Sequence, residues 1–524
     1  MRLCDYLDKG VSIDPDAPCL TTGPGADPGA DPGADRWTAT YAEVRELSSR
    51  ISAALAARGV APGERVAVIS ANDPRAFTCV FGISRAGAVW CPVNPRNEAA
   101  ENRELLELAG CVAVVYQAAY AGLVERIRPD LPQLTTLVSL DDDTHGVSGA
   151  LGWSAFLAAG AGREADLPAV DDLAMVVGTG GTTGRPKGVE LTGTNLETMS
   201  AITLMSYPFE GRPVYLALAP LTHAAGVLCF PVLALGGEVV VMRTPEVGSF
   251  LEHVEAHRVT HTFLPPTLVY MVLAHPDLER RDLSSLQCLW YGAAPMSAAR
   301  LEEAIERIGP VLGQLFGQTE APMMISTLAP REHFRADGTL ARERLSSAGR
   351  PAPLVTVQIM GEDGALLARG ERGEIVVRSS LVMAGYHRDP EATAAASAHG
   401  WHHTGDIGYL DDDGYLFIVD RAKDMVITGG FNVYSTEVEQ ALMQHPAVQD
   451  CAVIGLPDEK WGERVTAVVQ LRGGSEVPGA NLAAFVKERI GPVKAPKQVE
   501  VWPDLPRSKV GKVLKAEIKA SLLG

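Results

Sequence analysis

The sequence predicts an α/β fold, with a large multi-layer N-terminal domain of mostly parallel sheets and a small α+β C-terminal domain. Helical and strand patterns alternate along the first four hundred residues, which is typical of helices that cover a largely parallel sheet. Near residue 400 the pattern changes to turn signals and short strands. A chain of 524 residues also exceeds what one compact core usually holds, so at least two domains are expected.

The first predicted helix follows a capping box formed by Thr40 and Glu43, after which apolar residues recur at helical spacing from Val44 to Leu55. A buried strand is expected directly afterwards, over residues 65–69. Upstream of the helix, a Gly-Ala-Asp-Pro segment and two near copies occupy residues 25–35. Proline, glycine and aspartate at this density do not build a packed element, so a flexible surface loop is predicted there.

Further apolar stretches predict strands at 173–177 and around 214–219, 238–242 and 286–291. A helix is predicted from Ser297 to Ile308, with its apolar residues on one face.

The C-terminal region begins with a predicted turn at 411–414, Asp-Asp-Asp-Gly. A second capping box, Thr436 with Glu439, predicts the start of a helix. We place the boundary at about Lys423, which gives domains 1–422 and 423–524.

The composition excludes several classes of protein. No run of eighteen apolar residues occurs and no secretory signal opens the chain, so we expect a soluble, cytoplasmic protein without a membrane span. The net charge of −18 disfavours nucleic acid and anionic membranes as partners. Eight scattered cysteines form no Cys-x-x-Cys pair, so neither a zinc site nor a disulfide framework is predicted.

The most informative segment is the run from Thr179 to Gly188, Thr-Gly-Gly-Thr-Thr-Gly-Arg-Pro-Lys-Gly, which follows a predicted strand. Backbone N–H groups and hydroxyls in such a loop can donate to anionic oxygens, and glycine lets the main chain approach them. The alternative is a glycine-rich surface turn. Neither a Walker P-loop nor a dinucleotide fingerprint fits, because Gly184 is followed by Arg185 and no Gly-x-Gly-x-x-Gly precedes a helical pattern here. The loop predicts a phosphate cradle of another kind.

Further motifs follow along the chain. They are Pro-Leu-Thr-His at 220–223, Gly-Ala-Ala-Pro at 292–295, Leu-Phe-Gly-Gln-Thr-Glu at 315–320, Gly-Tyr at 385–386, Gly-Trp-His-His-Thr-Gly-Asp at 400–406, Asp-Arg-Ala-Lys-Asp at 420–424, Gly-Gly-Phe-Asn-Val-Tyr at 429–434 and Pro-Arg-Ser-Lys-Val-Gly-Lys at 506–512. With the loop, this series resembles the adenylate-forming superfamily of acyl-CoA synthetases, nonribosomal-peptide adenylation domains and beetle luciferases. It is most similar to acyl-CoA ligases, and the resemblance covers nearly the whole chain.

The resemblance implies an acid–thiol ligase, an acyl-CoA synthetase that uses ATP, Mg²⁺ and coenzyme A. Such enzymes first join a carboxylate to the α-phosphate of ATP, giving an acyl-adenylate, and a thiol then displaces AMP. Both steps pass through extra negative charge, which cations and N–H donors must neutralise. The resemblance also implies that the C-terminal domain is mobile.

Five residues are implied to meet the phosphates and the metal. Thr182, Thr183 and Lys187 would hold the β- and γ-phosphates, and Thr319 would meet the α-phosphate. Glu320 would ligate magnesium, a hard cation that prefers oxygen ligands. Without the surrounding motifs, the Thr319-Glu320 pair would be interpreted as a solvated surface.

The nucleoside is implied to lie between Phe316, against the adenine, and the pair Asp406 and Arg421, on the ribose hydroxyls. Taken alone, Asp406 would be interpreted as a turn residue. The other residues implied to bind ATP or CoA are Thr179, Gly181, Gly184, Gly292, Ala293, Ala294, Gly317, Gly429 and Gly430.

Three further residues have implied roles in the cycle. Lys512 would bridge the substrate carboxylate and the α-phosphate, since lysine is a compact charge on a flexible stem, although a lone terminal lysine is ordinarily only solubilising. His223 would gate the acyl pocket, or else be a satisfied core histidine. Lys423 would be the hinge of the C-terminal domain, or else an ordinary exposed lysine. Apart from Glu320 no metal ligand is predicted.

The implied acyl pocket is rich in small residues and methionines, which predicts a bulky apolar acid rather than acetate or an amino acid. Its predicted lining is His223, Ala225, Gly226, Gly292, Ala321, Met323 and Met324.

Three positions depart from the common family pattern: Gly180 replaces a frequent serine, Phe316 a frequent tyrosine and Thr222 a frequent aromatic residue. We expect adenylation to survive, because phenylalanine still stacks and glycine keeps its backbone N–H. Small residues at Gly429 and Gly430 would admit the pantetheine arm of either CoA or a carrier protein. The segments at 429–434 and 455–463 resemble those of CoA ligases, so free CoA is favoured over a carrier protein. The alternatives are a stand-alone enzyme that performs one half-reaction or loads a carrier protein, and a non-catalytic ligand-binding relative.

Overall fold

The protein is described here from a computed structural model. The structure describes residues 1–22, 37–163, 166–179, 186–218, 220–221, 224–243, 246–421, 424–508 and 513–523, without the side chains of residues 224 and 225. The loop predicted at 25–35 therefore lies outside the described residues.

The first large sheet carries the segment that leads into the predicted phosphate loop. Its strand order is β18-β8-β7-β4-β3-β5-β6, and the strands from β7 to β6 are parallel, whereas β8 and β18 run antiparallel at one edge. The strands are β3 Arg65–Ile69, β4 Val89–Val93, β5 Cys111–Tyr116, β6 Thr136–Ser139, β7 Leu173–Thr179, β8 Lys187–Thr192 and β18 Gly385–Tyr386. The helices of this half are α2 Tyr41–Ala57, α3 Pro74–Arg85, α4 Ala99–Ala109, α5 Ala121–Ile127 and α6 Trp153–Ala159.

The second large sheet has the order β15-β14-β13-β12-β11-β9-β10-β1-β2, with a parallel centre and antiparallel edges. Its strands are β1 Pro18–Thr22, β2 Thr38–Thr40, β9 Val214–Ala217, β10 Glu238–Val241, β11 His261–Leu264, β12 Cys288–Tyr291, β13 Leu312–Gln318, β14 Ala321–Leu328 and β15 Arg350–Pro351. The accompanying helices are α1 Leu3–Ile13, α7 Gly193–Ser206, α8 Ala224–Ala234, α9 Val247–Ala256, α10 Pro266–Ala274 and α11 Ala298–Ile308. The largest hydrophobic core joins side chains of both sheets with those of α3, α7 and α8 between them.

A third sheet, in the order β16-β17-β19-β20, is antiparallel throughout. It comprises β16 Thr356–Met360, β17 Gly373–Arg378, β19 His402–Leu410 and β20 Leu416–Arg421, and α12 Pro390–Ala396 precedes β19. The sequence pattern indicated turns and a short strand near its end but not the sheet itself, because antiparallel strands lack the helix–strand alternation of the other two sheets. Its last strand ends at Arg421, two residues before the predicted hinge.

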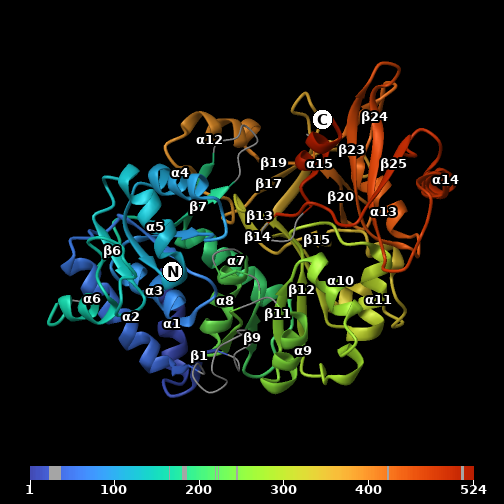
Figure 1. Ribbon diagram of the computed structural model, residues 1–524. Coiled ribbons are helices and arrows are strands. Elements are labelled where there is room, and N and C mark those ends of the chain that lie inside the picture. Colours follow the sequence, from blue (N-terminus) through green and yellow to red (C-terminus); the bar gives the residue numbers. More distant parts are fainter. Residues whose placement is uncertain are drawn as a thin grey trace.

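The C-terminal part is built on a mixed sheet in which β22-β21-β24-β23 are antiparallel neighbours and β25 pairs in parallel with β24. Its elements are β21 Val426–Thr428, β22 Phe431–Val433, α13 Ser435–Met443, β23 Val448–Asp458, β24 Gly462–Leu471, α14 Gly479–Ile490, β25 Gln498–Trp502 and α15 Lys515–Leu523. In Figure 1 these orange and red elements form a lobe of their own beside the larger part of the chain.

Several polar contacts join the described parts of the C-terminal lobe and the large domain. Gln440 of α13 donates to the carbonyl of Met296 at 3.1 Å, and Arg507 lies 3.5 Å from the Thr267 hydroxyl. At the predicted boundary, Ser435 Oγ donates to Asp420 at 3.0 Å. Arg507, five residues before Lys512, therefore lies against the large domain in this arrangement.

The local sequence signals are largely confirmed. Thr40 and Glu43 cap α2 reciprocally, β3 occupies residues 65–69, and α11 begins directly after Ser297. All eight cysteines are free and buried, and none of the described helices has the length and apolar character needed to cross a membrane.

The capping box predicted at Thr436 is wrong. The helix α13 begins one residue earlier, at Ser435, whose backbone N–H and hydroxyl donate to Asp420 of β20. Glu439 instead accepts from the backbone N–H of Val453 at 2.8 Å and pairs with Lys515. A tertiary contact thus supplies the cap in place of the local motif.

Candidate functional site

The predicted phosphate loop joins two neighbouring strands of the first sheet. Thr179 at the end of β7 and Lys187 at the start of β8 are register partners, so the loop between them closes on itself. Gly181, Thr182, Thr183 and Gly184 lie outside the described residues. The structure therefore fixes both ends of the loop, and its interior stays a prediction.

Lys187 meets Glu320 through a third residue, Tyr386. The Lys187 ammonium lies 4.5 Å from the centroid of the Tyr386 ring, and the Tyr386 hydroxyl donates to Glu320 Oε1 at 2.9 Å. Burial and the adjacent Glu320 carboxylate raise the pKa of Tyr386, so its hydroxyl stays protonated as a donor. Three motifs far apart in the chain thus converge at one place.

Glu320 is also held through its backbone, because its carbonyl accepts from the N–H of Met383 at 2.7 Å. The nearby Gln318 amide lies 3.3 Å from His402 Nε2. Burial lowers the pKa of His402, with Glu320 acting in the opposite direction, so the imidazole is neutral near pH 7.

The Glu320 carboxylate suits magnesium. Its donor atoms are hard oxygens, and Tyr386 uses Oε1. Among the described residues no cation pairs with this carboxylate, so Oε2 remains available for a metal. Glu320 would hold the ion at the phosphates, where the bound ion would supply positive charge.

The predicted ribose pair is assembled. Asp406 of β19 and Arg421 of β20 are register partners, and Arg421 Nε lies 2.6 Å from Asp406 Oδ1. Asp406 is buried, whereas 41% of the Arg421 side chain is exposed. This pairing orients the guanidinium at the surface of the site.

The predicted adenine segment lies where β13 turns into β14. Phe316 is half-buried, and the ladder between β13 and β14 is irregular after it. A Cβ on Gly317 would lie 2.4 Å from the backbone N of Met323, so only glycine fits there. Met323 itself has a φ of +64°, as does Ala293 with +66° at the end of β12. Strained backbone of this kind is concentrated at binding sites.

The remaining predicted positions surround this region. Gly292 directly follows β12, with Ala293 and Ala294 beyond it, and Thr319 lies in the turn after β13. Gly226, Ala321 and Met324 are buried, and Met323 is half-buried. For Ala225 only the backbone of α8 is described, and His223 lies outside the described residues.

Two predicted residues, Gly429 and Gly430, are not brought to this place. Gly429 and Gly430 form the tip of the hairpin between β21 and β22, with φ of +57° and +81°. The Gly429 N–H donates to the carbonyl of Trp461 in the same lobe. Lys423 and Lys512 lie outside the described residues, so hinge and bridging roles stay predictions.

A cavity of about 350 Å³ opens elsewhere, between β15, β16 and β19. Val357 and Ile359 line it, together with Arg350 and Arg369, and none of the predicted site residues does. Enclosed volume alone therefore does not locate the site on this chain.

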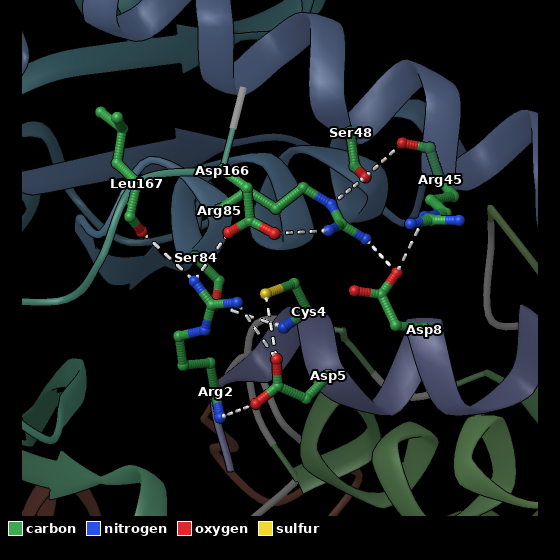
Figure 2. A network of polar contacts seen from close by, with 10 residues as sticks. All are labelled: Arg2, Cys4, Asp5, Asp8, Arg45, Ser48, Ser84, Arg85, Asp166 and Leu167. Atoms are coloured by element: carbon green, nitrogen blue, oxygen red, sulfur yellow. Dashed lines mark hydrogen bonds and ion pairs between the residues drawn. The ribbon is translucent and has the colours of Figure 1, made fainter. Parts of the chain in front are cut away.

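A cluster of potential metal ligands, Cys4, Asp5 and Asp8, lies on α1, also away from the site. Figure 2 shows the arginines that surround it: Arg2, Arg45 and Arg85. Arg2 pairs with Asp5, and both other arginines pair with Asp8. Because its carboxylates are already neutralised, the cluster fastens α1 to α2 and α3.

Sequence reasoning assigned no role to Tyr386 or His402, although both stand in quoted motifs. Tyr386 is 66 residues from Glu320 and acquires its position only when β18 joins the edge of the first sheet. No local periodicity signals such a contact.

Lys187, Tyr386 and Glu320 thus meet where the β8–β18 edge of the first sheet lies beside the β13–β14 turn of the second. A family model described as AMP-binding enzyme matches residues 8–387, and one described as AMP-binding enzyme C-terminal domain matches 437–512. The chain therefore belongs to the AMP-binding enzyme family, the adenylate-forming enzymes.

Individual relatives agree with this membership. The chain is 37% identical to a medium/long-chain-fatty-acid–CoA ligase, FadD8, of Mycobacterium tuberculosis, with 91% of this chain and 85% of the relative covered. It is also 37% identical to a feruloyl-CoA synthase of Amycolatopsis sp, with 92% and 93% covered. Among solved structures, the amide bond synthetase McbA from Marinactinospora thermotolerans matches with a TM-score of 0.87, 30% identity and 99% of each chain covered.

These matches confirm the predicted fold class and an enzyme of the acid–thiol ligase class that uses ATP. The two family models end at residue 387 and begin at residue 437, so neither covers the predicted boundary. The boundary at Lys423 stays a prediction.

Proposed function

We propose that this protein is an ATP-dependent acyl-CoA ligase, which activates a bulky hydrophobic carboxylic acid as acyl-AMP and transfers it to CoA. The observation that carries the proposal is the convergence of Lys187, Tyr386 and Glu320. It places a cation and a carboxylate on either side of one tyrosine side chain, at the end of the predicted phosphate loop.

In the first half-reaction a carboxylate oxygen of the acid attacks the α-phosphorus of ATP, and the bond to the β-phosphate oxygen breaks, releasing pyrophosphate. Lys187 would neutralise the leaving phosphates, and Thr319 would donate to the α-phosphate. Asp406 and Arg421 would hold the ribose, so that the α-phosphate stays in line with the attacking oxygen. Lys512 would arrive from the C-terminal lobe between carboxylate and phosphate.

In the second half-reaction a thiolate attacks the acyl carbon, and the bond to AMP breaks. The hairpin at Gly429 and Gly430 carries an exposed apolar surface suited to the CoA arm. Ile427, Phe431 and Trp461 are 53%, 60% and 38% exposed, respectively. Exposed large apolar groups gathered beside a glycine turn favour an interaction site.

The proposed acid is bulky and hydrophobic, aryl, alicyclic or medium-to-long acyl. Supporting it, the predicted lining offers small residues and methionines. Two relatives carry names that specify fatty and aromatic acids. Among the described residues of the lining there is no charged side chain to anchor an α-amino group.

For the acceptor of the acyl group, the proposal of CoA has competing candidates. One solved structure of similar fold is named an amide bond synthetase, so an amine is one alternative to CoA. A carrier-protein phosphopantetheine, or no acceptor at all, is the other. The cytoplasmic location and the magnesium ion belong to the proposal as well.

The decisive experiment incubates the full chain with ATP, MgCl₂ and single acids, and detects acyl-AMP and acyl-thioester separately by mass spectrometry. The acids are acetate, octanoate, palmitate, ferulate and leucine, and the acceptors are CoA, a phosphopantetheinylated carrier protein and a primary amine. We expect acyl-AMP without acceptor and acyl-CoA with CoA, at a higher kcat/KM for bulky apolar acids than for acetate. The Lys187→Ala variant serves as the negative control.

Each other outcome has a defined meaning. A preference for acetate or leucine over every bulky acid would overturn the substrate class. Acyl-AMP that is passed only to the carrier protein or the amine would overturn CoA as acceptor. Absence of acyl-AMP with all acids would leave a non-catalytic relative.

A further inference from the structure

Tyr386 is fixed by its backbone before its side chain makes any contact. Its strand β18 pairs with β8, where the His387 N–H donates to the carbonyl of Gly188 at 2.7 Å. The Tyr386 N–H donates to Thr393 Oγ1 of α12 at 2.9 Å. The backbone at Tyr386 is therefore held from two sides, beside the strand that begins with Lys187.

The side chain lies between two groups of opposite charge. On one side its ring is 4.5 Å from the Lys187 ammonium, a cation–π contact, and on the other its hydroxyl donates to Glu320 Oε1 at 2.9 Å. No ion pair joins Lys187 and Glu320 among the residues that the structure describes. Their charges thus remain apart.

The separation of the two charges would favour binding if the site takes ATP and a metal. A direct Lys187–Glu320 ion pair would neutralise both groups, and each would then have to be pulled free before it could meet phosphate or metal. The Tyr386 phenol instead makes one weak contact with each of the two charged groups. It restricts the carboxylate to one orientation through one oxygen and leaves the second oxygen to the ion, as groups behind metal ligands commonly do.

We propose that Tyr386 is a positioning residue, which orients Glu320 toward a divalent cation and keeps Lys187 apart from that carboxylate. The proposal rests on the proposed function for its ligands, ATP and the metal. It assigns Tyr386 no contact with the reacting atoms.

The test separates the hydroxyl from the ring. Tyr386→Phe removes the donor and keeps the ring, whereas Tyr386→Leu removes both. Tyr409→Phe is the matched control, because Tyr409 stacks on Phe417 of the next strand, with centroids 5.0 Å apart. Binding of Mn²⁺ to each full-length variant, in the presence of a non-hydrolysable ATP analogue, is followed by the electron paramagnetic resonance signal of free Mn²⁺.

We expect Tyr386→Phe to weaken Mn²⁺ binding roughly tenfold, the lower range for loss of a group behind a metal ligand. The Mg²⁺ concentration that half-saturates acid-dependent pyrophosphate exchange rises by a similar factor, while the KM for ATP at saturating Mg²⁺ changes about twofold or less. Tyr386→Leu also raises that KM several-fold, on the order expected for a lost cation–π contact. The control leaves all three quantities unchanged.

A double-mutant cycle completes the test. In a Glu320→Gln background, the Tyr386→Phe exchange should no longer alter Mn²⁺ affinity, because the oriented charge is gone. Wild-type Mn²⁺ affinity in Tyr386→Phe would overturn the proposal, as would the same tenfold loss in the Glu320→Gln background. If no acid supports pyrophosphate exchange in the wild type, the proposed function fails, yet the Mn²⁺ titration still decides the role of Tyr386.

Discussion

Two regions of this molecule, both predicted to serve the same reaction, are organised in opposite ways. Where β7 ends and β8 begins, Lys187 and Glu320 each contact Tyr386, and the three residues come from distant segments of the large domain. At the tip of the β21–β22 hairpin, Gly429 contacts Trp461 inside its own lobe, and Phe431 is 60% exposed. The first region is assembled, and the second presents its surface to solvent.

The difference follows from what each half-reaction requires. Phosphoryl chemistry needs fixed charges, which a rigid domain supplies without reorganisation. Thiol entry needs a surface that approaches only after pyrophosphate has left. We infer that the arrangement seen here serves adenylation, since Arg507 of the segment before Lys512 lies against Thr267. A rotation of the lobe would replace the surface predicted to carry Lys512 by the hairpin at Gly429 and Gly430.

The largest expected effect comes from Lys512→Ala. It removes the cation predicted to meet the attacking carboxylate, which typically costs on the order of a hundredfold or more in rate. The thioester step uses the other surface of the lobe and should be nearly spared. Single-turnover assays with acid plus ATP, and separately with preformed acyl-AMP plus CoA, measure the two steps. Equal losses in both steps would contradict the assignment of the two regions to different half-reactions.

A change at the predicted hinge should have the opposite effect, with the thioester step impaired and adenylation spared. Lys423→Pro fixes φ near −65° and removes an N–H, which restricts rotation while both sets of groups stay intact. We expect adenylation to be retained and the thioester step to fall by on the order of tenfold or more. The same pair of single-turnover assays measures it, with Glu476→Pro, at an exposed position after β24, as an off-hinge control. Retention of both steps would exclude a hinge at Lys423.

A smaller effect is expected from Trp461→Ala, which tests whether the exposed hairpin surface contacts CoA. Covering an exposed aromatic ring contributes on the order of 1 kcal/mol, so the KM for CoA should rise about fivefold to tenfold. The rate of acyl-AMP formation should not change. Exposed Val493, at 41% exposure and in the same lobe, gives the control Val493→Ala. An unchanged KM for CoA would remove this surface from the thiol path.

The sequence predicted the parts of the site that are local. Thr179 and Lys187 end and begin adjacent strands, and the apolar run before them is enough to indicate this. The pair Asp406 and Arg421 came from the resemblance, and the antiparallel register of β19 and β20 explains why they meet.

What the sequence did not predict depends on tertiary contacts. Tyr386 has no local partner, and only the addition of β18 to β8 places it beside Lys187. The capping box at Thr436 failed for the same reason, because Asp420 from another strand caps α13. The third sheet was missed since its antiparallel strands lack the helix–strand alternation that identified the other two.

The smallest expected effect concerns pH and distinguishes the stability of the two regions. Burial lowers the pKa of His261 and of His333 to about 4, both in the large domain. The lobe after residue 424 contains one histidine, His445, which is half-buried. Because the folded pKa values lie below the unfolded value of about 6.5, the unfolded chain binds protons first as pH falls. Stability is therefore full above about pH 6.5 and is lost progressively toward pH 4.

By pH 5.5 each buried histidine should cost the large domain about 1 kcal/mol. Protonation is unfavourable at His261 because its ring is fully buried, and this burial outweighs the hydrogen bond between Nε2 and the Pro208 carbonyl, 2.8 Å away, which acts in the opposite direction on the pKa. Hydrogen exchange at pH 7.5 and 5.5, corrected for intrinsic rates, should show lost protection in β11 and β12 and little change in β23 and β24. His261→Gln cannot take up the proton, so it should reduce that loss by about half. An equal loss of protection in both regions, or a loss that His261→Gln leaves unchanged, would show that the acid sensitivity of the large domain has another origin.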